Sequence, residues 1–155
     1  MENSPYRKII KLLKESGVDY KLIYHEPVYT SEQAEKITGL DLGQGMKSLL
    51  VKGDRKFVLA VIPGDKRLDV RKMALLMKVK RVGLATKEEV KERMHCELGS
   101  CYPLGGVVSL RTIADPSLLG KNTLLLSPGV NDKTIIMSAE DYFRVAGPER
   151  HKIIM

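Results

Sequence analysis

Cysteine and the larger aromatic residues are scarce in this sequence. Its 155 residues include two cysteines, two phenylalanines and no tryptophan. Two cysteines are too few for the disulfide framework of a small secreted protein. The shortage of tryptophan and phenylalanine leaves few side chains for direct stacking on nucleic-acid bases.

Long apolar runs are missing too. No stretch approaches the length of a membrane-spanning helix, and residues 1–5 lack the basic-then-apolar order of a signal peptide. We therefore expect a cytoplasmic protein with no membrane partner.

The common catalytic and metal-binding motifs are also absent. There is no Walker phosphate loop, no Gly-x-Ser-x-Gly, no His-Glu-x-x-His and no paired Cys-x-x-Cys. His95, Cys96 and Cys101 are close in sequence, but no second ligand cluster exists to complete a zinc site. His25 has no serine or cysteine partner at a readable spacing and is expected to be structural. We expect no metal and no cofactor.

Positive charge, by contrast, is in excess. Lys and Arg total 26 against 19 for Asp and Glu, giving a net charge of +7 and a pI near 9.4. A basic surface favours polyanionic partners such as nucleic acid. The charge is dispersed along the chain and is also common in soluble proteins, so it does not decide the function.

The length suits one domain, residues 1–155, with a single core. Capping residues and hydrophobic periodicity predict helices at 4–16 and 30–39, and further helices after Asp69, Thr86 and Ser138. Alternating or continuous apolar runs predict strands at 20–25, 46–52, 56–63, 81–85, 107–110, 123–127 and 133–138, with a three-residue turn at 53–55. No regular β-α-β rhythm is present. This pattern predicts an α+β domain with a mixed, mostly antiparallel sheet flanked by helices.

The segment "GQGMKSLLVKG", residues 43–53, contains an unexpected charge. Side chains alternate along a strand, so Lys47 shares a face with Leu49 and Val51. The other face carries Met46, Ser48 and Leu50, so neither face is clearly the polar one and the strand is expected to be buried on both sides. A strand-end lysine whose amine reaches water is the ordinary explanation, and from the pattern alone it is the favoured one.

Several segments in order resemble the YbaK/prolyl-tRNA-editing family of aminoacyl-tRNA deacylases. The resemblance runs from about Tyr6 to Ala146, and each piece is weak alone. The segments that carry it are "HEPVYTSEQA", "GMKSLLVKG", "VIPGDKRLDVRKMALLM", "KRVGLATKEEV", "GSCYPLGG", "ADPSLL" and "SPGVNDKTIIMSAEDYFRV".

The resemblance implies a cleft for the aminoacylated terminal adenosine of tRNA, with Lys47 as the catalytic lysine. Its ammonium would hold the terminal phosphate or the ester region. The resemblance further implies a substrate-binding set comprising Thr30, Ser31, Gly99, Ser100, Cys101, Pro103, Gly105, Gly129 and Thr134. Backbone N–H groups of the glycine-containing loop would approach the substrate carbonyl.

The family resemblance predicts a trans-acting deacylase that hydrolyses Ala- or Cys-tRNA(Pro), with prolyl-tRNA synthetase as a candidate partner. Thr134 stands where the cysteine-removing branch has an aspartate, which leaves the amino acid open. Tyr102, Leu104 and Pro103 are expected to narrow a pocket facing Leu49 and Val51, and so to exclude proline. Two alternatives remain: a non-catalytic module that binds tRNA or a synthetase, and a domain that binds a small regulatory molecule.

Overall fold

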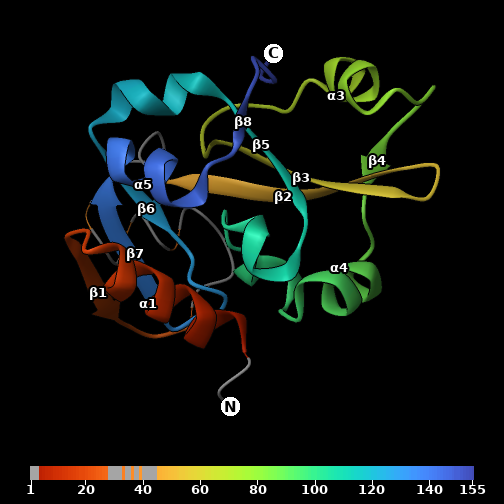
Figure 1. Ribbon diagram of the computed structural model, residues 1–155. Helices are drawn as coiled ribbons and strands as arrows, with labels where there is room; N and C mark the ends of the chain where they lie inside the picture. The colour runs from red at the N-terminus through yellow and green to blue at the C-terminus, as the bar shows by residue number, and fades with distance from the viewer. Residues whose placement is uncertain (1–3, 28–32, 34–35, 37–38, 40–44) are drawn as a thin grey trace.

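The computed structural model describes residues 4–27, 33, 36, 39 and 45–155. Its strands form two sheets, one ordered β1-β7-β6 and one ordered β4-β2-β3-β5-β8 (Figure 1). A parallel bridge between Gly45 and Leu125 joins them. The strands are β1 (Tyr20–Tyr24), β2 (Met46–Gly53), β3 (Lys56–Pro63), β4 (Gly83–Leu84), β5 (Arg111–Ala114), β6 (Thr123–Leu126), β7 (Lys133–Ser138) and β8 (Glu149–Arg150).

Antiparallel pairing predominates. Only the β3–β5 and β5–β8 pairs are parallel among the strand pairs of the described residues. The predicted α+β domain is confirmed, although its strands divide between two sheets.

The helices begin at the residues that the sequence predicts as caps. They are α1 (Pro5–Ser16), α3 (Val70–Met77), α4 (Lys87–Met94) and α5 (Ala139–Ala146), with 3-10 turns η1 (Leu98–Ser100), η2 (Gly105–Val108) and η3 (Pro116–Lys121). Ser4, Asp69, Thr86 and Ser138 each accept a hydrogen bond from a first-turn amide, and Thr86 forms a full capping box. The helix predicted at 30–39, with Thr30 and Ser31, lies mostly outside the described residues.

Two local predictions are wrong. Gly53 pairs with Lys56, so the β2–β3 turn has two residues rather than three. Residues 107–110 do not form a strand, because η2 occupies the first half and β5 starts only at Arg111. The chain turns tightly there: a Cβ on Gly105 would lie 2.1 Å from the Thr112 hydroxyl oxygen.

Apolar residues pack on both faces of the β2–β3 hairpin, as expected for a strand buried on two sides. α3 and α4 lie on opposite sides of this hairpin (Figure 1). The α3 side holds Val51, Val58 and Ile62 together with Ile153. The other side is a larger cluster formed with α1, α4, α5 and the three-stranded sheet.

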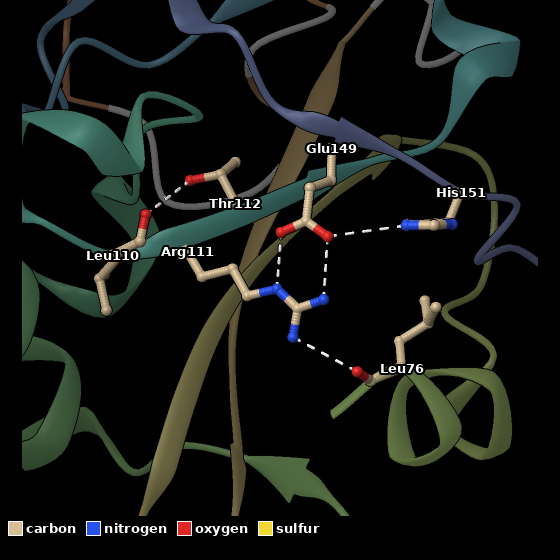
Figure 2. Close-up of polar contacts among 6 residues, drawn as sticks. All are labelled: Leu76, Leu110, Arg111, Thr112, Glu149 and His151. Carbon is tan, nitrogen blue, oxygen red and sulfur yellow. Dashed lines mark hydrogen bonds and ion pairs between the residues drawn. The ribbon is translucent and has the colours of Figure 1, made fainter. Parts of the chain in front are cut away.

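The last residues, 149–155, form a segment that we call the C-terminal strap. Figure 2 shows how its first residues are held: the Arg111 guanidinium donates to both oxygens of Glu149, at 2.6 and 2.9 Å, and to the Leu76 carbonyl at 3.3 Å. His151 Nε2 lies 3.6 Å from the Glu149 carboxylate. The strap is thereby fixed to β5 and to the end of α3.

The end of the strap is held by a buried carboxylate. Asp115, 1% exposed, accepts hydrogen bonds from the amides of Ile153 and Ile154 at 2.8 and 3.2 Å. The strap in turn pairs with the 63–69 loop, since the Asp69 amide donates to Ile153 O and the Met155 amide to Arg67 O. This loop is the one that contacts Lys47.

Candidate active site

Lys47 is the second residue of β2, opposite Ile62 of β3. It lies on the Leu49 and Val51 face, as predicted. Its side chain is half-buried, and Nζ donates a hydrogen bond to the Lys66 carbonyl at 2.9 Å. The charge at the start of a buried strand therefore has a fixed partner at the strand end.

The 63–69 loop gives this end of the strand a basic character. The Gly64 amide donates to Gly45 O at 2.7 Å, which closes the loop against the start of β2. Lys66 and Arg67 are exposed. An ammonium that is held by one carbonyl keeps two N–H donors for an anionic group of a ligand.

The pairing registers bring Lys47 close to the other sheet. Gly45 and Leu125 form a parallel bridge. Lys47 lies two residues after Gly45, and Ser127 lies two residues after Leu125. Leu126 pairs with Ile135, so continuing the antiparallel register by one residue sets Ser127 beside Thr134. The start of β2 and the end of β6 therefore meet at the joint between the sheets.

A hollow of about 500 Å³ lies near Ser127, whose hydroxyl donates to the carbonyl of Ser100, one of its lining residues. Of the predicted substrate residues it contains Ser100 and Gly129, whereas Lys47 and Thr134 are not among its lining residues. The lining combines charged and polar side chains with apolar surface, and its residues are Lys91, His95, Cys96, Glu97, Ser100, Gly129, Val130 and Asn131.

The loop at 99–105 is held from behind by two buried tyrosines. The Tyr102 hydroxyl donates to Met94 O at 2.6 Å, and the Tyr142 hydroxyl donates to Pro103 O at 2.8 Å. Burial raises the pKa of both phenols. Tyr102 and Leu104 belong to the large buried cluster, and neither is among the residues that line the hollow.

The facing wall was also predicted incorrectly. Leu49 and Val51 pack with the α3 cluster, on the opposite side of β2 from Tyr102. Two predicted substrate residues lie outside the hollow. Gly105 packs against Thr112, and Gly99 is an exposed residue of η1.

Two backbone amides of the predicted pocket have partners within the protein. The Ser100 amide donates to Glu97 O at 2.9 Å, and the Gly129 amide donates to the Ser127 hydroxyl at 3.2 Å. They are therefore not free to meet a substrate carbonyl in this conformation.

Ser127 is a residue that the sequence analysis missed. Its hydroxyl donates to Ser100 O at 3.1 Å and so joins the 127–132 loop to η1. Both segments line the hollow. The only sequence signal was its position between a strand and Pro128-Gly129, which is typical of any turn.

His25 has a partner that lies far away in sequence. Its Nδ1 is 2.7 Å from Glu26 O, and its Nε2 is 2.8 Å from the Thr134 hydroxyl. A carbonyl can only accept, so Nδ1 carries the hydrogen and the Nε2 of a neutral ring accepts from Thr134. The threonine hydroxyl, 109 residues further along the chain, could not be found from local spacing.

The two cysteines interact with each other. A hydrogen bond between the thiols raises the pKa of Cys96 and lowers the pKa of Cys101, and burial further raises that of Cys96. Cys101 Sγ also donates to Leu98 O at 3.3 Å.

Among the described residues, no group of three or more His, Cys, Asp or Glu side chains is arranged to hold a metal ion. Within the same residues, no helix is long and apolar enough to cross a bilayer.

Comparison with known proteins identifies the family. The model of the aminoacyl-tRNA editing domain matches residues 25–145. The chain belongs to this family. The match begins at His25 and covers the β2–β3 hairpin, the 99–105 loop and Thr134.

Two curated relatives span nearly the whole chain. The multifunctional Ser/Thr-tRNA deacylase ProXp-y of Escherichia coli (strain K12) is 33% identical over 149 residues, which are 93% of this chain and 89% of that protein. The prolyl-tRNA editing protein ProX of Acetoanaerobium sticklandii is 24% identical over 151 residues, covering 94% and 92%. Among solved structures, a candidate trans-editing enzyme for prolyl-tRNA synthetase has a TM-score of 0.85 at 24% identity, with 97% of each chain covered, and supports the fold.

Proposed function

We propose that the protein is a trans-acting aminoacyl-tRNA deacylase that hydrolyses the ester of mischarged tRNA, with tRNA(Pro) as the expected acceptor. The observation that carries the proposal is Lys47: within an editing-domain match, its ammonium is held at a strand end by the Lys66 carbonyl, 2.9 Å away.

Lys47 acts as a positioning and electrostatic group. Its free N–H donors bind the terminal phosphate or the ester oxygen and hold the scissile bond in one orientation. Water adds to the ester carbonyl, and the terminal ribose hydroxyl leaves with a proton. Neither step requires a metal or an organic cofactor.

The amino acid removed is proposed from the pocket. Alanine and cysteine esters of tRNA(Pro) are the substrates expected from the sequence. A second candidate is a serine or threonine ester, since His95, Ser100 and Asn131 place polar groups in the hollow and the curated relative at 33% identity is named for Ser/Thr-tRNA. A side chain with a hydroxyl gains more from polar partners than alanine does.

The first experiment measures deacylation of tRNA(Pro) charged with Ala, Cys, Ser, Thr or Pro. Lys47→Ala should lose at least about 100-fold in kcat/KM, in the range that removal of one aimed donor costs. Lys47→Met keeps the alkyl stem and should lose as much. Lys52→Ala is the matched control, because Lys52 lies at the other end of β2 and pairs with Glu89.

Thermal unfolding of each variant separates lost chemistry from lost folding. A folded Lys47→Met protein with wild-type kcat/KM would remove Lys47 from the mechanism. Hydrolysis of Pro-tRNA(Pro) as fast as the other esters would show that the protein does not proofread this tRNA.

The competing proposal is a module that binds tRNA or prolyl-tRNA synthetase without turnover. Such a module would show salt-dependent tRNA binding with no ester hydrolysis in the panel. Adding prolyl-tRNA synthetase to the same assay tests whether that enzyme raises the deacylation rate.

A further inference from the structure

An exposed aromatic surface lies beside the candidate site. Tyr24, the last residue of β1, is 70% exposed. Its ring centroid is 5.4 Å from Lys133 Nζ, which also lies 5.2 Å from the ring of Tyr6 on α1. We call Tyr6, Tyr24 and Lys133 the tyrosine–lysine platform.

The platform is held in place by its own contacts. Lys133 is paired opposite Tyr24 in the β1–β7 register, and its ammonium also lies 3.0 Å from Asp132. Burial raises the pKa of Tyr6, and a hydrogen bond with Tyr24 adds to the effect. A ring that is already oriented loses little conformational freedom when a ligand stacks on it.

The platform and the hollow are neighbours, because the 127–132 loop lines the hollow and packs against the start of α1. Gly129, Val130 and Asn131 line the hollow. A Cβ on Gly129 would lie 3.6 Å from the Tyr6 amide, so the loop packs directly against the start of α1. Lys133 follows this loop. On the other side, Tyr24 and Lys133 directly precede the hydrogen-bonded pair His25 and Thr134.

We propose that the tyrosine–lysine platform stacks an unpaired nucleotide of the tRNA 3′ end, next to the terminal aminoacylated adenosine. The inference rests on the proposed function and extends it to the nucleotides before the ester. Every base has a flat π-face, so stacking on an exposed tyrosine binds single-stranded nucleic acid with little sequence preference.

Charge favours nucleic acid over an apolar protein segment as the occupant. The chain carries a net charge of +7. Arg7 and Lys8 are exposed on α1 next to Tyr6, and Lys91 lies in the hollow. Exposed cations on α1 and in the hollow suit a polyanionic ligand.

The test uses the full chain and two RNA probes: uncharged tRNA(Pro), and the same tRNA lacking its unpaired 3′ nucleotides. Tyr24→Ala should weaken binding of intact tRNA about tenfold, whereas Tyr24→Phe keeps the ring and should stay within about twofold. Binding of the truncated tRNA should be the same for all three proteins. Leu75→Ala is the matched control, since Leu75 is a 74% exposed residue of α3, outside the platform.

Kinetics provide the second readout. Tyr24→Ala should raise KM for aminoacyl-tRNA and leave the rate of hydrolysis of an aminoacyl ester of adenosine alone unchanged. Equal tRNA binding by wild type and Tyr24→Ala overturns the platform and leaves the deacylase proposal standing. The two proposals can also separate in the other direction. If Tyr24→Ala loses tRNA binding but the wild type hydrolyses no aminoacyl-tRNA, the platform is supported and the deacylase proposal is overturned. If wild type binds neither RNA, the platform is overturned.

Discussion

Asp115→Ala tests whether the C-terminal strap is held by one buried carboxylate. Asp115 accepts hydrogen bonds from three backbone amides, those of Ser117 at 2.9 Å, Ile153 at 2.8 Å and Ile154 at 3.2 Å. The substitution leaves these donors without the carboxylate. The strap then loses its attachment next to Ile153, which is 0% exposed and fills the α3 cluster.

The expected loss follows from the number of buried donors. A hydrogen bond to a charged group contributes about 1.5–3 kcal/mol, and the amide of Ser117 can be solvated at the start of η3. Counting the two strap amides gives a loss of about 3–6 kcal/mol in the free energy of unfolding. This would be a large share of the total for a domain of this size, which is typically about 5–15 kcal/mol.

The effect should depend on pH. Burial raises the pKa of Asp115, but the hydrogen bonds from Ser117, Ile153 and Ile154 outweigh it and the pKa is lowered overall. A folded-state pKa below the unfolded value means that the stabilisation is complete above the unfolded pKa, about 3.9, and is lost as pH falls through the folded-state pKa. The difference between wild type and Asp115→Ala should therefore be largest at neutral pH and shrink in acid.

Urea unfolding followed by circular dichroism measures the loss at pH 7 and pH 3. Asp19→Ala, which removes an exposed carboxylate, is the control and should change the unfolding free energy by less than about 0.5 kcal/mol. Because the strap pairs with the 63–69 loop, deacylation should also fall in Asp115→Ala at temperatures where it is folded. A loss below about 1 kcal/mol would show that the strap is held mainly by its apolar residues.

Three further substitutions test other contacts. The hydrogen bond from Arg111 lowers the pKa of Glu149, so the stability that the ionised carboxylate contributes is lost as pH falls. Glu149→Gln removes this contribution, and its melting temperature should therefore fall less than that of wild type between about pH 5 and 3. Gly105→Ala should lower the melting temperature, since the new Cβ would lie 2.1 Å from the Thr112 hydroxyl oxygen, whereas Gly106→Ala, with open space around it, should not. Tyr142→Phe should cost about 1 kcal/mol in urea unfolding, because it removes a hydrogen bond to a buried loop carbonyl; an unchanged midpoint would mean that the carbonyl finds another donor.

Much of the fold could be predicted because its signals are local. The caps at Ser4, Asp69, Thr86 and Ser138 each depend on a side chain and an amide three residues later. The strands of the β2–β3 hairpin follow continuous apolar runs. The strand predicted at 107–110 is wrong because its residues favour strands, whereas the close packing of Gly105 on Thr112 enforces a turn.

The division into two sheets could not be predicted in this way. It depends on which strands pair, and β5 pairs with β3 and β8 across long intervals of sequence. The same limit applies to the site. Lys47 is recognisable from the motif around it, but His25 and Ser127 act through partners on other segments. The scarcity of tryptophan and phenylalanine gave no indication that a tyrosine, Tyr24, would be an exposed aromatic residue.

The position of the site at the joint between the sheets explains why each of its motifs is weak alone. Lys47 comes from the five-stranded sheet, Thr134 from the three-stranded sheet, and Ser127 from the loop that follows β6. If the proposed site is assembled in this way, residues that hold backbone in place matter to it: Asp115 holds the strap, and Ser127 holds η1 beside the hollow. Such residues leave no spacing signal in the sequence. The arrangement also means that substitutions far from Lys47 in sequence, such as Asp115→Ala, can change the rate of a reaction that they do not touch.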